Sequence, residues 1–319
     1  MSVLLLKLLR RIYGVIHPAT APPIRVHYAG QAASDYIQQI LETPDPCMIC
    51  RFGNVELNAT LRAYHIRRHA QYWGEKSWNY IRGQIHHFWW DQSAQESMWM
   101  DAGFFPATPT YLERFGERMI ADMQLIDVLA FWEGKQDYFV RQIQHFLTQA
   151  KLIRFSDLEP YYHEHPWSKA LQGKTVLVIH PFVDTIQQQY QKREMLFQNP
   201  DILPEFELKT LRAVQSIAGN DCGFPDWFAA FDWMCEAISK IEFDIAIIGA
   251  GAYGLPLAAH VKRLGKKAIH LGGPTQILFG IKGGRWDEMP FFQQLYNEHW
   301  VRPAPHEVPP KIGRVKAYW

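Results

Sequence analysis

Residues 244–273 read DIAIIGAGAYGLPLAAHVKRLGKKAIHLGG, and this stretch decides how the rest of the chain is interpreted. An apolar run leads into Gly249, Gly251 and Gly254, and a helix-like segment follows. In a strand–turn–helix unit, the G-x-G-x-x-G spacing permits a tight turn, close approach of the backbone to a diphosphate, and close helix packing. Free N–H groups and the helix dipole then favour an anion. The pattern predicts a phosphate-binding turn, and a close-packed turn without a ligand is the alternative.

Two features of this turn argue against a nicotinamide or flavin dinucleotide. The acidic residue that usually grips the adenosine ribose about 20 positions later is missing, and His270 stands near that place. The fingerprint also normally opens its domain, whereas here it lies close to the C-terminal end. An NAD- or FAD-dependent oxidoreductase is therefore kept only as an alternative hypothesis.

Continuous apolar segments alternate with amphipathic ones along most of the chain. This alternation predicts an α/β fold, a Rossmann-like and mostly parallel sheet with helices on both faces. Such sheets bind ligands beyond the carboxyl ends of their strands. The loops expected to matter therefore follow Cys50, Ile179, Ile248 and Leu271. Strands are expected at residues 47–50, 126–132, 151–155, 174–180, 206–214, 243–249 and 267–271.

The overall composition sets the domain plan and excludes one class of partner. With 319 residues, 48% of them hydrophobic, the chain can bury a full core. We expect one α/β domain over residues 31–286, an N-terminal helix and linker over 1–30, and an extended C-terminal arm over 287–319. A net charge of +1 gives no bulk electrostatic reason to bind nucleic acid.

The cysteines indicate a reduced protein. Cys47 and Cys50 form C-x-x-C, which is typical of redox or zinc sites. Residues three apart on a strand point to opposite faces, so we expect two buried side chains and not a ligand pair. The expected location is the cytoplasm.

A second strand–loop–helix lies in ICRFGNVEL. Arg51 at the strand end can hold a phosphate or carboxylate through two hydrogen bonds. Gly53 permits a sharp turn, and Asn54 suits the start of a helix. Glu56 falls in the first helical turn, where a carboxylate is favourable in any case. Its alternative role is to ligate Mg²⁺ or Mn²⁺ beside a diphosphate.

Three further loops hold candidate residues. His180 lies at a strand tip, where an imidazole can act as a general base or bind phosphate. Gly272 and Gly273 open a helix and predict a second backbone nest for an anion. Arg285 is close enough in sequence to reach the same cleft. Asp221, in a glycine-flanked loop, is a candidate base, metal ligand or sugar-hydroxyl ligand.

Residues 1–16 predict an amphipathic helix that is too short to span a bilayer. One hypothesis is that it docks on the body of the protein or on a partner. The other is that it forms a peripheral membrane anchor with basic flanks, which would place the protein at the inner face of the membrane. Its apolar side carries Leu5, Leu8, Leu9, Ile12 and Ile16, and its basic residues are Lys7, Arg10 and Arg11.

These motifs together resemble the GT-D-type glycosyltransferases, bacterial enzymes of surface-glycan and glycoprotein glycosylation. The likeness rests on RFGNVEL, on VLVIHPF, and on the block from FDIAIIGAGAYG to IKGGRW, which frame residues 32–286. The resemblance implies a Rossmann-like fold that binds a nucleotide-sugar, typically a UDP-sugar, and a divalent metal held by an Asp-x-Glu motif. Asn54 and Glu56 occupy the matching positions, so an amide replaces the acidic member.

The leading hypothesis is transfer of a sugar from a nucleotide-sugar to a glycan or glycoprotein acceptor. The glycine loops and Arg51 would bind the diphosphate, and His180 or Asp221 would deprotonate the acceptor hydroxyl. An uncharged Asn54 lowers the expected metal affinity. Arg51, Arg285 and helix N-termini would then neutralise the leaving group, and a degenerate scaffold without activity is the non-enzymatic alternative.

Overall fold

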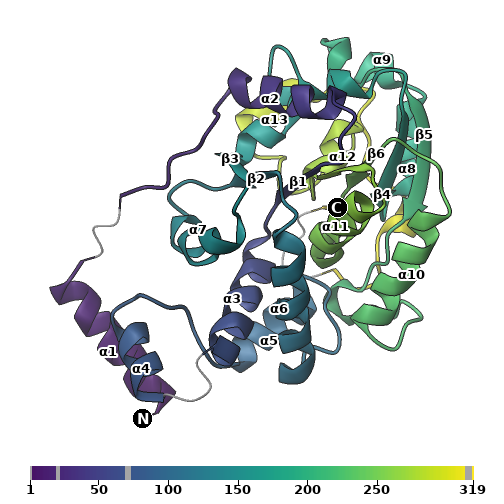
Figure 1. The fold of residues 1–319 in the computed structure, drawn as a ribbon. Coiled ribbons are helices and arrows are strands. Elements are labelled where there is room, and N and C mark those ends of the chain that lie inside the picture. The colour runs from purple at the N-terminus through teal and green to yellow at the C-terminus, as the bar shows by residue number, and fades with distance from the viewer. Residues whose placement is uncertain (1, 19–21, 69–72, 313–317) are drawn as a thin grey trace.

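The fold is described from a computed structural model, which covers residues 2–18, 22–68, 73–312 and 318–319. The described residues form a seven-stranded, all-parallel sheet of order β3-β2-β1-β7-β6-β4-β5 (Figure 1). The expected α/β class is thus confirmed. The strands are β1 (Met48–Arg51), β2 (Val128–Phe131), β3 (Lys151–Arg154), β4 (Thr175–His180), β5 (Glu207–Arg212), β6 (Ile245–Ile248) and β7 (Lys267–His270).

Helices cover both faces of the sheet because its central strands are apolar on both sides. Residues of β2 and β6 are buried throughout. One face packs against α3 (Asn54–Arg68), α5 (Gln92–Met100), α6 (Pro109–Met123), α7 (Asp137–Ile143), α10 (Trp227–Ser239) and α11 (Gly254–Arg263). The other packs against α2 (Gln31–Glu42), α8 (Val183–Tyr190), α9 (Arg193–Leu196), α12 (Pro274–Leu278) and α13 (Pro290–Leu295).

The sheet positions the site because parallel strands all end at the same edge. In the register of the sheet, Arg51 of β1 lies opposite Ala130 of β2, and Ile248 of β6 lies opposite His270 of β7. Strands β1 and β7 are neighbours although more than two hundred residues separate them in the chain. The loops after β1, β6 and β7 therefore leave the sheet side by side.

The two cysteines of the C-x-x-C motif are buried on opposite sides of the sheet. Cys50 packs in the apolar cluster on one face and Cys47 in the cluster on the other. Both thiols are free, and burial raises the pKa of Cys47 to about 11. The expectation of two buried side chains is confirmed.

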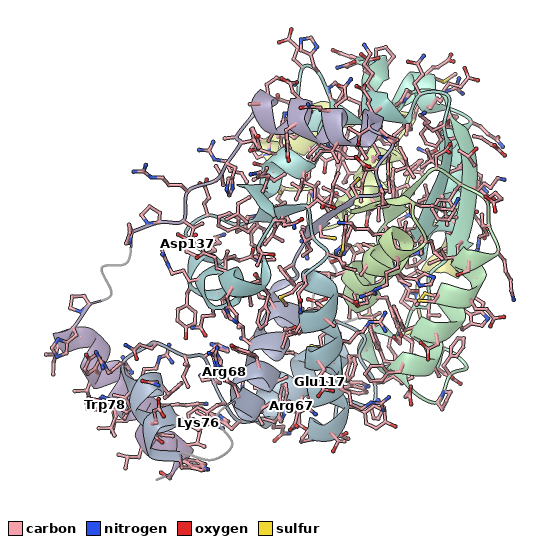
Figure 2. The ribbon with its side chains drawn as sticks, viewed as in Figure 1. Arg67, Arg68, Lys76, Trp78, Glu117 and Asp137 are labelled. Carbon is pink, nitrogen blue, oxygen red and sulfur yellow. The ribbon has the colours of Figure 1, made fainter. Side chains whose placement is uncertain are left out.

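The N-terminal helix α1 (Val3–Ile16) packs on α4 (Trp73–Ile81), and together they form a lobe that projects from the α/β body (Figure 1). Leu6 is fully buried against Tyr80 and the residues that follow α4. Arg10 donates to the carbonyl oxygen of Ile85 at 2.9 Å and stacks on the Tyr80 ring. Figure 2 shows Trp78 on the outer part of this lobe. In the described residues, no helix is long and apolar enough to cross a membrane.

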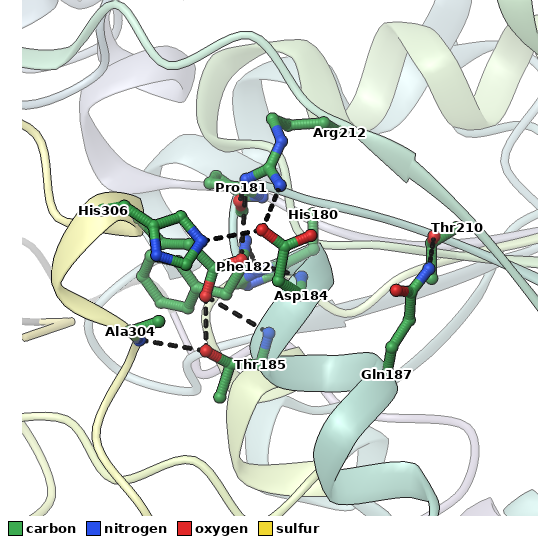
Figure 3. A network of polar contacts seen from close by, with 11 residues as sticks. His180, Pro181, Phe182, Asp184, Thr185, Gln187, Thr210, Arg212, Ala304 and His306 are labelled. Atoms are coloured by element: carbon green, nitrogen blue, oxygen red, sulfur yellow. Dashed lines mark hydrogen bonds and ion pairs between the residues drawn. The ribbon is translucent and has the colours of Figure 1, made fainter.

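The C-terminal arm is fastened to the body by buried side chains. Phe292 and Trp300 join the core, and Glu307 is buried although it is charged. The Glu307 carboxylate accepts from the backbone N–H groups of Asp184 and Thr185 and from the Thr185 hydroxyl. Figure 3 shows the surrounding network, where Asp184 also pairs with Arg212 and His306. A residue 123 positions away thus caps the first turn of α8.

Replacing Glu307 with Ala is expected to lower the free energy of unfolding by about 2–3 kcal/mol. The change removes a helix cap and leaves the buried Thr185 hydroxyl without its acceptor. Urea unfolding of the purified protein measures the loss. The matched control is Glu298→Ala in the same arm. The Glu298 side chain is 88% exposed, so its replacement should lower the free energy of unfolding by less than about 0.5 kcal/mol. Equal losses for both variants would contradict the capping role.

Candidate functional site

A cleft of about 410 Å³ lies at the carboxyl edge of the sheet. Its walls are the loops after β1, β4, β5, β6 and β7, together with Trp132 after β2. The expectation that RFGNVE and GAGAYG share one cleft is therefore confirmed. Of the residues expected in the site, the cleft is lined by Arg51, Gly53, Asn54, Glu56, His180, Gly249, Gly251, Gly272, Gly273 and Arg285.

Gly249 and Gly254 are required by packing. A Cβ atom at Gly249 would lie 2.5 Å from Cδ2 of His180 and 2.8 Å from the carbonyl oxygen of Gly272. A Cβ at Gly254 would lie 2.2 Å from Nε2 of His270. Gly254 is buried and does not line the cleft. It serves close packing, as the glycine spacing suggests, and makes room for a histidine of the next strand.

Gly251 is the glycine of this turn that opens to the cleft. It has a φ of 51° and is exposed, and a Cβ atom added to it would approach only the Ala102 carbonyl oxygen, at 3.7 Å. Within the described part of the chain, the N–H groups of Ala250, Gly251 and Ala252 have no hydrogen-bond acceptor. Ala250 and Gly251 line the cleft, and successive free N–H groups at such a turn favour an anion.

Gly272 and Gly273 do not form the second nest that the sequence suggested. The N–H of Gly272 donates to the carbonyl oxygen of Ile248 at 3.0 Å, so it is not available to a ligand. Gly272 has a φ of 71°, and the Arg51 side chain lies over its Cα. Gly273 faces the Tyr318 ring. These glycines instead make room for side chains of the cleft wall.

Two arginines supply the positive charge of the cleft. The Arg51 guanidinium stacks on the Phe155 ring at 3.9 Å from its centroid. Burial lowers the pKa of Arg51, and the nearby charge of Arg285 lowers it further. Arg285 is exposed and lies over the Tyr318 ring at 5.1 Å. The positive charges of Arg51 and Arg285 repel each other, and a bound dianion would relieve that repulsion.

Asn54 and Glu56 do not form the metal pair that the resemblance implies. The Asn54 Oδ1 accepts from Nε2 of the buried Gln136 at 2.6 Å. The Glu56 carboxyl group folds over Gly53 at the N-terminus of α3. Burial raises the pKa of Glu56, and the neighbouring Asp101 raises it further. The Asn54 amide oxygen is engaged and the Glu56 carboxyl group is folded onto the first turn of its own helix, so the two are not held as a ligand pair for the expected Mg²⁺ or Mn²⁺.

Another possible metal group in the described residues is Asp184, His306 and Glu307, outside the cleft. Arg212 lies 2.8 Å from Asp184 and 3.5 Å from Glu307. The Arg212 guanidinium thus already supplies the positive charge that a metal ion would bring to these carboxylates. This cluster is therefore a structural clasp for the C-terminal arm.

His180 is placed to donate a hydrogen bond. Its Nδ1 accepts from the backbone N–H of Phe182 at 3.0 Å. Burial lowers the pKa of His180 to about 3, so the ring is neutral and its proton is on Nε2. Nε2 already carries a proton, and a proton added to Nδ1 would break the hydrogen bond from Phe182. The geometry thus disfavours the general base expected from the sequence.

Asp221 lies outside the lining of the cleft. Its side chain is exposed and accepts from the N–H of Gly223 at 2.9 Å, which makes it a turn residue. The expected catalytic role of Asp221 is therefore not supported. Besides Glu56, the cleft is lined by the carboxylate of Asp101, which follows α5 and belongs to no motif recognised in the sequence.

Other residues missed in the sequence complete the cleft. Trp132, Tyr318 and Trp319 contribute aromatic walls. Within the described chain, three buried polar atoms at this place have no hydrogen-bond partner: Nδ1 of His270, Oγ1 of Thr275 and Oε1 of Gln276. Buried polar atoms are nearly always satisfied in native proteins. Two of these residues, His270 and Gln276, also line the cleft.

Comparison with known protein families, characterised proteins and solved structures finds no match for this chain.

Glu159, which is buried near Arg51 and Arg285, should make stability depend on pH. Burial raises the pKa of Glu159 to about 7 from 4.5. As pH rises, Glu159 ionises near pH 4.5 in the unfolded chain but only near pH 7 in the folded protein. Its contribution to the unfolding free energy is therefore full below pH 4.5 and is lost as pH rises through 7. We expect the unfolding free energy of the wild type to fall by about 2–3 kcal/mol across this window relative to Glu159→Gln. Urea unfolding at several pH values tests this, and parallel curves would contradict it.

Proposed function

We propose that the chain is a glycosyltransferase that moves a sugar from a nucleotide-diphosphate sugar, with UDP as the expected nucleotide, to a hydroxyl of a glycan or glycoconjugate. The observation that carries the proposal is the convergence of Arg51, Arg285 and the free N–H groups around Gly251 on one cleft. These groups are the ones that would stabilise a departing diphosphate. Aromatic walls at Trp132 and Trp319 suit a base or a sugar face.

The chemistry proposed for the cleft uses protein groups alone. The acceptor oxygen bonds to the anomeric carbon, and the bond from that carbon to the diphosphate oxygen breaks. The electron pair leaves with the diphosphate, where Arg51 and Arg285 stabilise the charge. Glu56 takes the hydroxyl proton, because its raised pKa makes it a stronger base than an ordinary carboxylate. His180 donates from Nε2 to the substrate.

The alternative of a nicotinamide or flavin oxidoreductase is less well supported by the same geometry. In dinucleotide-binding folds, an acidic side chain after the next strand binds the ribose. Here His270 ends β7, and its ring fills the space beside Gly254. Burial lowers the pKa of His270 to about 3, so it offers no charge to a ribose or a phosphate.

Nucleotide binding tests the proposal directly. Calorimetric titration with UDP, UDP-sugars, GDP and NAD⁺ is expected to show binding of a nucleoside diphosphate in preference to NAD⁺, unchanged by EDTA. Arg285→Gln should weaken that binding about 10- to 100-fold, because a hydrogen bond to a charged group is lost. Arg51→Gln should act in the same direction.

The matched control is Arg302→Gln, since Arg302 is exposed, pairs with Asp287 and lies outside the cleft lining. It should bind nucleotide as the wild type does. Failure to bind any nucleotide of the panel, or tight binding of NAD⁺ alone, would remove the proposal. Unchanged binding in both cleft variants would show that the arginines are not the diphosphate site.

A further inference from the structure

We propose that α1 binds the surface of an anionic lipid bilayer. The starting observation is where exposed apolar side chains gather. The described residues contain fifteen exposed large hydrophobic side chains, and six of them lie on this one helix. The six are Leu4 (80% exposed), Leu5 (43%), Leu8 (54%), Ile12 (47%), Val15 (79%) and Ile16 (65%). Single exposed apolar residues are ordinary, but a contiguous group marks an interaction surface.

The contact with α4 does not account for these side chains. Leu6, Leu9 and Tyr13 face the lobe's small core. At 100° per residue, the six exposed residues occupy a different side of the helix. Docking on the protein therefore uses one face of α1, and a second apolar face is left without a partner in the described part of the chain. The two hypotheses drawn from the sequence, that α1 docks on the protein and that it contacts a membrane, are therefore compatible.

The charges of the helix identify the occupant of the second face. Residues 2–16 include three basic side chains and no acidic one. Arg11 lies at one border of the exposed apolar stripe. Lys7, four residues away on the same border, lies 3.5 Å from Asp91 and keeps 44% of its side chain exposed. Arg10 holds the helix to the body through Ile85 and Tyr138, so it is not the lipid contact. A basic border beside an apolar stripe complements an anionic bilayer surface.

The shape of the lobe also suits a bilayer. At 1.5 Å per residue, the 14 residues of α1 span about 21 Å, which is shorter than the apolar core of a membrane. The helix must therefore lie along the surface. Trp78 is 54% exposed and lies beside Tyr13, with 6.3 Å between ring centroids. Figure 2 shows Trp78 in the lobe that α1 and α4 form, and an exposed aromatic ring of this kind suits the headgroup level of a membrane.

Vesicle flotation of the full chain tests this proposal. One set of vesicles is phosphatidylcholine alone, and the other contains about one third phosphatidylglycerol. We expect binding to the anionic vesicles, and loss of most of it at about 0.5 M salt. Leu8→Gln combined with Ile12→Gln should lower the partition coefficient about tenfold or more, because the exposed apolar contact is lost. Arg11→Gln should reduce the preference for anionic vesicles.

Met195→Gln is the matched control, since Met195 is 55% exposed on α9 and lies outside α1. It should bind vesicles as the wild type does. All the substituted side chains are exposed, so thermal midpoints should be unchanged. Absence of binding to anionic vesicles, or full binding by the double variant, would overturn the proposal. A dimer that the double variant converts to a monomer, with no vesicle binding, would instead show a second copy on this face. Nucleotide binding is measured separately, so the two proposals fail independently.

Discussion

The close contact between Gly249 and the side chain of His180 is the constraint on which the cleft depends. A side chain at position 249 would meet His180, the Gly272 carbonyl group and Thr275 within 2.8 Å. Three loops, after β4, β6 and β7, can approach this closely only because the middle one has no Cβ. The same contact buries His180, and burial makes that ring neutral.

Positive charge in the cleft is held in place by packing. Arg51 is flat against Phe155 and near the buried Glu159, whose carboxyl group also accepts from Tyr161. Each of these groups is costly to bury alone. Their arrangement holds a guanidinium in position before any anion arrives, which is the preorganisation that the proposed sugar transfer would require.

Much of the cleft followed from the sequence, and the exceptions share one cause. The parallel sheet and the joint cleft of RFGNVE and GAGAYG were predictable from local patterns of apolar residues and glycines. The close packing of Gly254 was also expected, but its partner was not, since the contact is with His270 in the next strand. Asn54 is engaged by Gln136, 82 positions away, and Asp101 enters the cleft from a helix end that no motif marks.

The sequence by itself determined the α/β class, the strand–loop–helix units and an amphipathic N-terminal helix, because each depends on residues close together in the chain. Only the tertiary structure decided which N–H groups are free, which histidine nitrogen carries the proton, and which face of α1 is uncovered. Those properties depend on contacts between distant segments: Glu307 with α8, the β4, β6 and β7 loops with one another, and α4 with α1. Burial and hydrogen bonding between such segments follow from packing, which a local pattern of residues does not specify.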